Sequence, residues 1–544
     1  MTSRRLRETN HAQTADPGAA LNCADSSEPL KPMPVGAFPA LSFAYRKSTM
    51  NVLYIDIDSL RRDHLGCYGY HRNTSPVIDA IAREGVRFEN IYVSDVPCHP
   101  SRTALWSGRH GFRTGVVGHG GTACEPFREG ASRAWAGTFY EEGWMKALRD
   151  LDYHTTTISS FGERHGCWHW YAGFNEVMNC GKGGMENADE IVPVAIDWIA
   201  RNKSRKWFLH VNLWDPHTPY RVPEEWGDPF AGEPLPEWMT EEVLARSIAG
   251  YGPHSPQEPT GFSADNPHAH YTRMPAPIDS MEKASAWFNG YDAGVRYADE
   301  HIGHLIAALK QYGLYDDTII VISADHGENL GELNVWGDHQ TADEFTCNVP
   351  LIIRWPGQAA GVNHGLHYHF DWPATLIDGL GGKVPSVWDG KSFAPAMRQG
   401  ENGGRDYLVL SQGAWAVQRG VRFRHLNEDW LMLRTWHDGL KDFGPVTLFN
   451  LTSDLHEQKD LSQSCPDIVA YASRLLDEWH GTMAERSDQD IDPLMTVLRE
   501  GGPYHTLGEL PAYLERLRAT GRGKHAEALS SRHPQREKEK ATLR

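Results

Sequence analysis

A buried β-strand is predicted by the apolar run Thr318-Ile319-Ile320-Val321-Ile322, which ends at Asp325-His326-Gly327. A similar run, Val52-Leu53-Tyr54-Ile55, ends at Asp56-Ile57-Asp58-Ser59. Residues 206–213 form a third run that is closed by Trp214-Asp215-Pro216-His217, and residues 349–353 form a fourth. Continuous apolar runs of this length are typical of strands that are covered on both faces.

Helical patterns lie between these runs, notably over residues 75–84 and 283–312. The second pattern places apolar residues on one helical face, namely Ala298, Ile302, Leu305, Ile306 and Leu309. The alternation predicts an α/β fold with a large, mostly parallel central sheet and helices on both faces. Ligands bind at the carboxyl ends of strands in such sheets, so we expect Asp58, His217 and Asp325 to meet there.

The chain changes character after about residue 400. Short β-like segments occur at residues 407–411, 415–419, 430–434 and 446–450, and a helical pattern follows at 468–485. We predict a catalytic domain at residues 50–400 and a smaller α+β subdomain at residues 401–500. Residues 501–544 are rich in charged side chains and are predicted to be a solvated tail. Residues 1–49 precede the regular apolar patterning and are predicted to be a disordered extension.

Composition narrows the classes of function. A length of 544 residues suits one large domain and a smaller one. No apolar run approaches the ~20 residues of a membrane span, and a net charge of −18 opposes non-specific nucleic-acid binding. We therefore expect neither a membrane nor a nucleic acid as partner. The N-terminal arginines are not followed by an apolar stretch, which predicts a cytoplasmic location.

The segment around Cys98 contains a candidate nucleophile. It reads Pro97-Cys98-His99-Pro100-Ser101-Arg102-Thr103-Ala104-Leu105-Trp106-Ser107-Gly108. Pro100 and Ser101 favour a helix start, so Cys98 is expected at a loop-to-helix junction, where free backbone N–H groups favour an anion. Arg102 adds a cation one turn later. A single cysteine is more often an inert core residue, so its neighbours decide its interpretation.

The pattern Cys98-x-Pro100-x-Arg102 resembles the signature of the sulfatase family, which belongs to the alkaline phosphatase superfamily. In this family the cysteine is oxidised to formylglycine, whose hydrate is the nucleophile. Similar segments occur at residues 57–69, 85–88, 323–328, 349–357 and 448–454. The resemblance implies a sulfuric ester hydrolase that cleaves sulfate monoesters with Cys98 and Arg102 as catalytic residues. It also implies a formylglycine-generating or anaerobic maturing enzyme as partner.

The resemblance further implies a site for one divalent cation, formed by Asp58, Cys98, Asp325 and His326. Calcium is the expected ion, because hard cations prefer oxygen ligands. Ser59 stands where many sulfatases have a second aspartate, and His326 stands where many have asparagine. A site with fewer carboxylates and one imidazole also suits manganese. Asp56 shares a strand face with Asp58 and either completes the site or is paired inside the fold.

By resemblance, His217 contacts the sulfate and protonates the leaving oxygen, a role that suits a group whose ordinary pKa is near neutrality. His339 lies where the family usually has a sulfate-binding lysine. Many sulfatases have a second sulfate-binding lysine, but the corresponding segment here, residues 158–165, has no lysine at that place. Arg164, His165 and His119 are the candidate substitutes, and the glycines beside His119 allow a ligand to approach closely.

Two other functions remain open. The first is a phosphonate monoester or phosphodiester hydrolase of the same superfamily, with which Ser59 and His326 are compatible. The second is a catalytically silent carbohydrate-binding protein in which Cys98 is never oxidised, although the intact set of site residues argues against it. The expected substrate is a sulfated small molecule or saccharide. Aromatic residues near His217 and His165 suit stacking on a ring and equally suit core packing.

Overall fold

The structure, a computed structural model, describes residues 50–128, 137–263, 269–398, 400–489 and 491–533. The predicted extension at residues 1–49 and the last eleven residues of the predicted tail lie outside the described residues. The described residues belong to one compact unit, so residues 50–398 and the C-terminal segments are packed together.

The large sheet has nine strands and matches the predicted α/β architecture. Eight of them follow the order β11 (Gly361–Asn363), β2 (Val86–Tyr92), β10 (Asn348–Arg354), β7 (Thr318–Ser323), β1 (Asn51–Ile57), β6 (Trp207–Leu213), β4 (His154–Ile158) and β5 (Glu176–Met178), and β12 (His367–Tyr368) pairs with β2. Only β10 is antiparallel to its neighbours, and the other pairs are parallel. The prediction of a mostly parallel sheet is confirmed.

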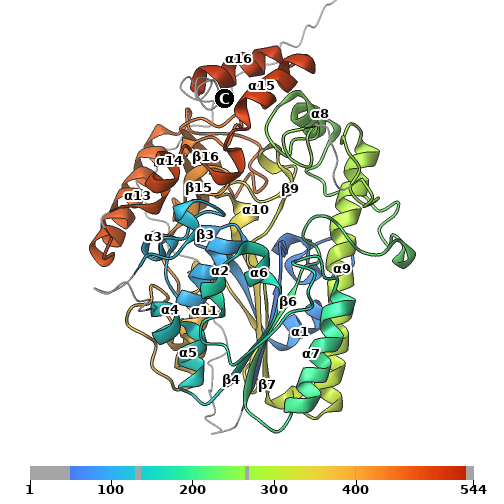
Figure 1. The fold of residues 1–544 in the computed structure, drawn as a ribbon, viewed down its shortest axis with the longest axis vertical. Coiled ribbons are helices and arrows are strands. Elements are labelled where there is room, and N and C mark those ends of the chain that lie inside the picture. Colours follow the sequence, from blue (N-terminus) through green and yellow to red (C-terminus); the bar gives the residue numbers. More distant parts are fainter. Residues whose placement is uncertain (1–49, 129–136, 264–268, 399, 490, 534–544) are drawn as a thin grey trace, which may run out of the picture. The chain divides into compact units, whose positions relative to one another are not determined.

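Helices cover both faces of this sheet, as Figure 1 shows. One layer contains α1 (Pro76–Glu84), α7 (Ala188–Asn202) and α9 (Met281–Gln311). The other contains α2 (Cys98–Ser107), α5 (Trp144–Arg149) and α11 (Asp371–Gly379). Helix α9 starts at a side-chain cap, because the Ser280 hydroxyl accepts the Lys283 N–H at 3.3 Å. Its predicted apolar face, including Ile302, Leu305 and Leu309, is buried in the core.

The C-terminal sheet has the order β16 (Val446–Asn450), β15 (Glu428–His437), β14 (Val417–His425), β13 (Tyr407–Gln412) and β3 (Asp95–Val96). Helix α13 (Pro466–Arg486) packs on it through a separate apolar cluster. Strand β3 comes from the predicted catalytic domain and immediately precedes the Cys98 segment. The α+β region is therefore continuous with that domain through a shared sheet.

Residues 501–533 differ from the predicted solvated tail. After α14 (Pro493–Arg499), the chain forms η8 (Tyr504–Thr506), α15 (Leu510–Ala519) and α16 (Gly523–Arg532). A small apolar cluster anchors α15 and α16 against Tyr251 and Leu440. Arg516 and Arg522 both bind the buried carboxylate of Glu258. The segment is rich in charged residues, so its composition does not indicate this packing. A short apolar stripe and paired arginines are sufficient to hold amphipathic helices against the rest of the protein.

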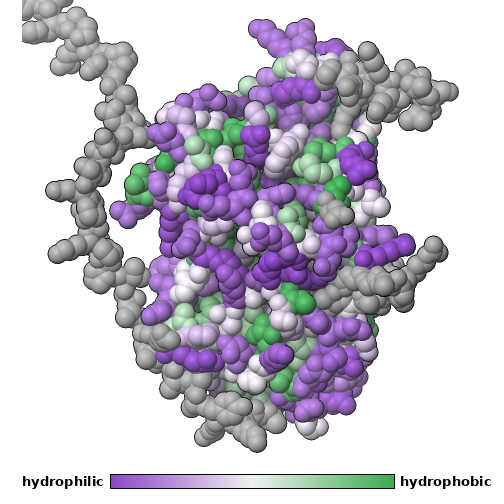
Figure 2. Space-filling model, turned by 90° about the vertical axis from the view of Figure 1, so that its left-hand side faces the viewer, coloured by the Kyte–Doolittle hydropathy of each residue, from purple (hydrophilic) through white to green (hydrophobic). Residues whose placement is uncertain are grey.

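The surface is mixed in character. On the face in Figure 2, hydrophilic residues predominate and apolar residues are scattered. Within the described ranges, no helix combines the length and the apolar character that crossing a bilayer requires.

Candidate active site

The carboxyl ends of adjacent strands bring the predicted site residues together. Strands β1 and β7 are parallel, with Asp56 opposite Ser323, so Asp58 and Asp325 leave the sheet at the same edge. Asp58, Cys98, Asp325 and His326 are all buried, and each offers one ligand atom that lies within 4.8 Å of the others. The prediction that residues far apart in the sequence converge at this edge agrees with the geometry.

Cys98 is the first residue of α2, as the proline and serine after it predict. Its Sγ lies 3.0 Å from His326 Nε2. The hydroxyl of Ser101 donates to the carbonyl of Asp325, which holds the helix start against the end of β7. Burial, together with the charges of Asp58 and Asp325, raises the pKa of the Cys98 thiol well above its usual value. The thiol is therefore protonated and is a poor nucleophile as it stands.

Arg102 pairs with three buried carboxylates near Cys98. Its Nε lies 3.0 Å from Asp56 Oδ2, and its Nη1 lies 3.1 Å from Asp58 Oδ2 and 3.2 Å from Asp325 Oδ2. The guanidinium also packs over the ring of Phe161 at 4.5 Å. Since Arg102 is completely buried and its charge faces these groups, it holds the three carboxylates in position.

Asp56 and Ser59 stand outside the four-residue group. Asp56 Oδ2 lies 3.2 Å from His210 Nε2, in addition to Arg102, so its carboxylate is paired inside the fold. The Ser59 hydroxyl donates to Asp58 Oδ1 at 3.0 Å, and its N–H donates to Asp325 Oδ1 at 3.3 Å. Ser59 has a left-handed backbone with φ of 62°. Its contacts orient the two carboxylates, which is how outer residues hold metal ligands.

The charge balance of this group suits a divalent cation. Three buried carboxylates, Asp56, Asp58 and Asp325, share one arginine, which leaves a formal charge of −2. Burial alone would raise the pKa of Asp58, but His217 and Arg102 outweigh it and hold the pKa well below its usual range. Burial and the Asp58 charge raise the pKa of Asp325 to about 7, although Arg102 opposes them. A bound cation would relieve this excess negative charge.

His326 is oriented as a metal ligand. Its Nδ1 lies 2.8 Å from the carbonyl of Gly327 and must donate to it. In the neutral ring, Nε2 then keeps its lone pair and faces Cys98, Asp58 and Asp325. Two carboxylates and one imidazole nitrogen are donors that protein metal sites commonly use, so the residues fit a divalent ion.

His217 follows β6 and reaches the same edge. Its Nδ1 donates to the carbonyl of Thr218, so Nε2 is free of the proton in the neutral ring. Burial lowers the pKa of His217 to about 3, Asp58 opposes this, and Arg164 and Arg221 add to it. The ring is therefore neutral before an anion binds beside it.

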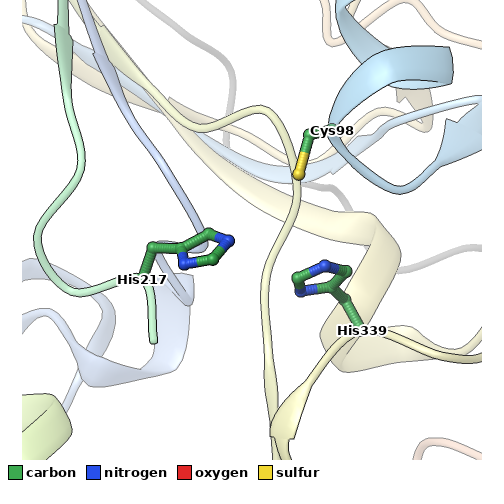
Figure 3. A group of neighbouring side chains, drawn as sticks. All are labelled: Cys98, His217 and His339. Carbon is green, nitrogen blue, oxygen red and sulfur yellow. The ribbon is translucent and has the colours of Figure 1, made fainter. Parts of the chain in front are cut away.

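His339 follows β9 (Trp336–Asp338) and closes the other side. Its ring centroid lies 4.0 Å from that of His326 and 5.8 Å from that of His217. Figure 3 shows the rings of His217 and His339 on either side, with the sulfur of Cys98 directed between them. Burial and His326 lower the pKa of His339 well below its usual value, so the ring is neutral.

Arg164, His165 and His119 form a second group of side chains near His217, linked by a ring contact and by electrostatic interactions. The Arg164 guanidinium lies 5.1 Å over Trp214 and donates to the carbonyl of Gly183 at 3.3 Å. The rings of His119 and His165 are 5.1 Å apart. Burial lowers the pKa of His119 and His165 well below the usual value, so both rings are neutral. The positive charge of this group therefore comes from Arg164.

The sequence interpretation missed three residues that lie near these side chains. His505 of η8 lies 3.0 Å from His119, although it belongs to the predicted tail. His99 lies 6.3 Å from His165, centroid to centroid. Arg221 donates to the carbonyl of Pro219 at 3.2 Å, and its Nε and Nη2 have no hydrogen-bond partner within the described ranges. Arg221 stands four residues after His217, so the sequence offered a reason to consider it as a site residue. Nothing in the local sequence of His505 indicated that it lies near His119.

Comparison with known proteins gives a consistent result. The model of the family described as Sulfatase matches residues 50–382. An N-acetylglucosamine-6-O-sulfatase of Bacteroides thetaiotaomicron is 23% identical over 525 residues, which cover 83% of this chain and 89% of that protein.

Solved structures share the fold. The structure of BT4656 with its substrate D-glucosamine-2-N,6-O-disulfate has a TM-score of 0.62 and 20% identity, and the match covers 81% of this chain and 99% of that one. The phosphonate monoester hydrolase of Silicibacter pomeroyi has a TM-score of 0.60 and 21% identity, with coverage of 81% and 96%. At such identities the structural likeness bears on the fold alone.

Proposed function

The chain belongs to the sulfatase family and is a sulfuric ester hydrolase, and we propose that it cleaves sulfate monoesters of saccharides with a nucleophile made from Cys98. The observation that carries the proposal is the buried group of Asp58, Cys98, Asp325 and His326, with His217 and Arg164 beside it. It combines a nucleophile position, a cation site and an acid at one edge of the sheet.

Conversion of Cys98 to formylglycine is part of this proposal and requires a maturing enzyme as partner. The modified residue would supply a hydroxyl nucleophile in place of the thiol. Two features support it: Cys98 opens a helix whose N–H groups favour an anion, and the unmodified thiol has a raised pKa.

Asp58, Asp325 and His326, with the oxidised Cys98, would hold the metal. A divalent cation there would polarise the sulfuryl oxygens. The two carboxylates favour calcium, and the imidazole of His326 also admits manganese. Arg102 pairs with both carboxylates and partly neutralises them.

His217 would act as the acid for the leaving oxygen. An anionic sulfate beside the ring favours its protonated form and raises its pKa from the low value of the free protein. Arg164 and the partly unpaired Arg221 provide the fixed positive charge that attracts the anion.

His217→Ala is expected to slow hydrolysis of sugar sulfates by about 10²–10⁴-fold, because a poor leaving group needs a proton. Nitrophenyl sulfate leaves as a stable anion, so its loss is expected to stay within about tenfold. In the wild type, kcat for sugar sulfates should fall as pH rises through the pKa of His217 in the substrate complex, whereas kcat for nitrophenyl sulfate should not. His304→Ala, an exposed histidine on α9, is the matched control. Equal losses for both leaving groups would contradict the acid role.

A saccharide substrate is supported by the relatives, which include an N-acetylglucosamine-6-O-sulfatase and a glucosamine disulfate complex. Two exposed aromatic residues suit stacking on a sugar ring: Trp168, three residues after His165, and Tyr504, directly before His505.

Substrate selectivity tests the proposal against the phosphonate monoester or phosphodiester alternative. Sulfate monoesters are expected to show at least about tenfold higher kcat/KM than phosphate diesters or phosphonate monoesters. The reason is space, since a diester needs room for a second organic group where the rings of His217, His326 and His339 crowd the nucleophile. Both substrate series should be measured on one metal-replete preparation whose Cys98 is verified by mass spectrometry. Preference for the diesters would favour the alternative.

A further inference from the structure

Cys98, His217 and His339 form a second possible ligand group within the active site. All three are buried, and each offers one ligand atom that lies within 4.8 Å of the other two. The three come from separate elements, the start of α2, the loop after β6 and the loop after β9, and they face one another in Figure 3. We propose that the chain with unconverted Cys98 binds Zn²⁺ through these three side chains.

The hydrogen bonds leave the donors available. His217 uses Nδ1 to donate to Thr218, which leaves Nε2 as a lone-pair donor. His339 is 6% exposed, and its Nδ1 has no hydrogen-bond partner among the described residues. The Cys98 thiol releases one proton when it becomes a metal ligand.

The chemistry of the group favours zinc over calcium. One thiolate and two imidazoles are typical zinc ligands, and three protein ligands leave the fourth position open for water. Tetrahedral zinc at ligand distances of 2.0–2.3 Å requires donors about 3.3–3.6 Å apart, so side-chain shifts of about an ångström would close the site. The neighbouring donors Asp58 and Asp325 are held by Arg102 and prefer harder cations.

This site does not depend on the proposed sulfatase activity. Oxidation of Cys98 to formylglycine removes the sulfur, so the zinc site exists only in unconverted chains. Zinc that survives mild chelation should therefore match the unconverted fraction measured by mass spectrometry. After conversion of Cys98, the site of Asp58, Asp325 and His326 would still be available for the hydrolytic metal.

The experiment uses full-length, metal-free, unconverted protein and Co²⁺ as a spectroscopic substitute for zinc. We expect one equivalent of Co²⁺ to give a thiolate charge-transfer band, and Zn²⁺ to displace it. His217→Ala and His339→Ala should each weaken Zn²⁺ binding at least tenfold, whereas Asp325→Asn should change it less than threefold. Cys180→Ser, which alters an exposed cysteine, is the control and should bind as the wild type does.

Two results would overturn the proposal. One is a thiolate band that survives loss of His217 and His339 but disappears in Asp325→Asn, which would place the ion among Asp58, Asp325 and His326. The other is no thiolate band with folded, unconverted protein. Circular dichroism checks that each variant is folded, and His217→Gln replaces His217→Ala if the alanine variant does not fold.

Discussion

Cys98→Ala is expected to reduce sulfate ester hydrolysis by at least about a thousandfold, because it removes the only side chain from which the proposed nucleophile is made. The fold should survive, since the change deletes one sulfur at the start of α2 and leaves the backbone of the helix intact. A stability loss of about 1–2 kcal/mol is expected for such a small buried deletion. Steady-state kinetics on nitrophenyl sulfate and thermal unfolding measure the two quantities.

The matched control is Cys347→Ala. Cys347 is also completely buried, but it lies outside the four-residue group. This variant should lose similar stability and keep activity within about threefold. If Cys98→Ala retained near wild-type activity, or if active protein carried only unmodified Cys98, the formylglycine mechanism would be wrong.

Removal of the hydrolytic metal is expected to reduce activity about as much as Cys98→Ala does. Exhaustive chelation should abolish activity, and Ca²⁺ or Mn²⁺ should restore it, with the more effective ion identifying the preferred one. Asp58→Asn should lower kcat/KM at least about a thousandfold, because it removes a charged ligand beside the nucleophile.

Thermal unfolding separates the loss of the metal from the loss of the fold. In metal-free protein, Asp58→Asn removes a carboxylate that pairs with Arg102 and whose lowered pKa shows that the fold stabilises its charged form, so the melting temperature should fall moderately. Saturating metal at 100 times its Kd should stabilise the wild type by about 2.7 kcal/mol, and the variant much less. Asp317→Asn, an exposed aspartate directly before β7, should behave as the wild type. If metal stabilised the wild type and Asp58→Asn equally, Asp58 would not be a metal ligand.

Much of the fold and site was readable from local patterns. Apolar runs that end in carboxylates predict β1 and β7, and the parallel arrangement of such strands puts Asp58 and Asp325 at one edge. Pro100 and Ser101 predict a helix start next to Cys98, and α2 begins at Cys98 in the structure. These inferences succeed because they depend on periodicity and on short-range backbone preferences.

Other features needed the three-dimensional arrangement. The sequence alone determined the α/β architecture, because apolar periodicity is local, and it predicted the candidate metal ligands and the candidate nucleophile, because each lies in a short motif. Only the tertiary structure decided that Asp56 pairs with Arg102 and His210, that His505 reaches His119 across 386 residues, and that the apparent tail packs as helices. It also decided that His217 and His339 are neutral, because their pKa values depend on burial and on charges from other elements. Pairing across long separations and desolvation arise only when the chain is folded, so no local pattern encodes them.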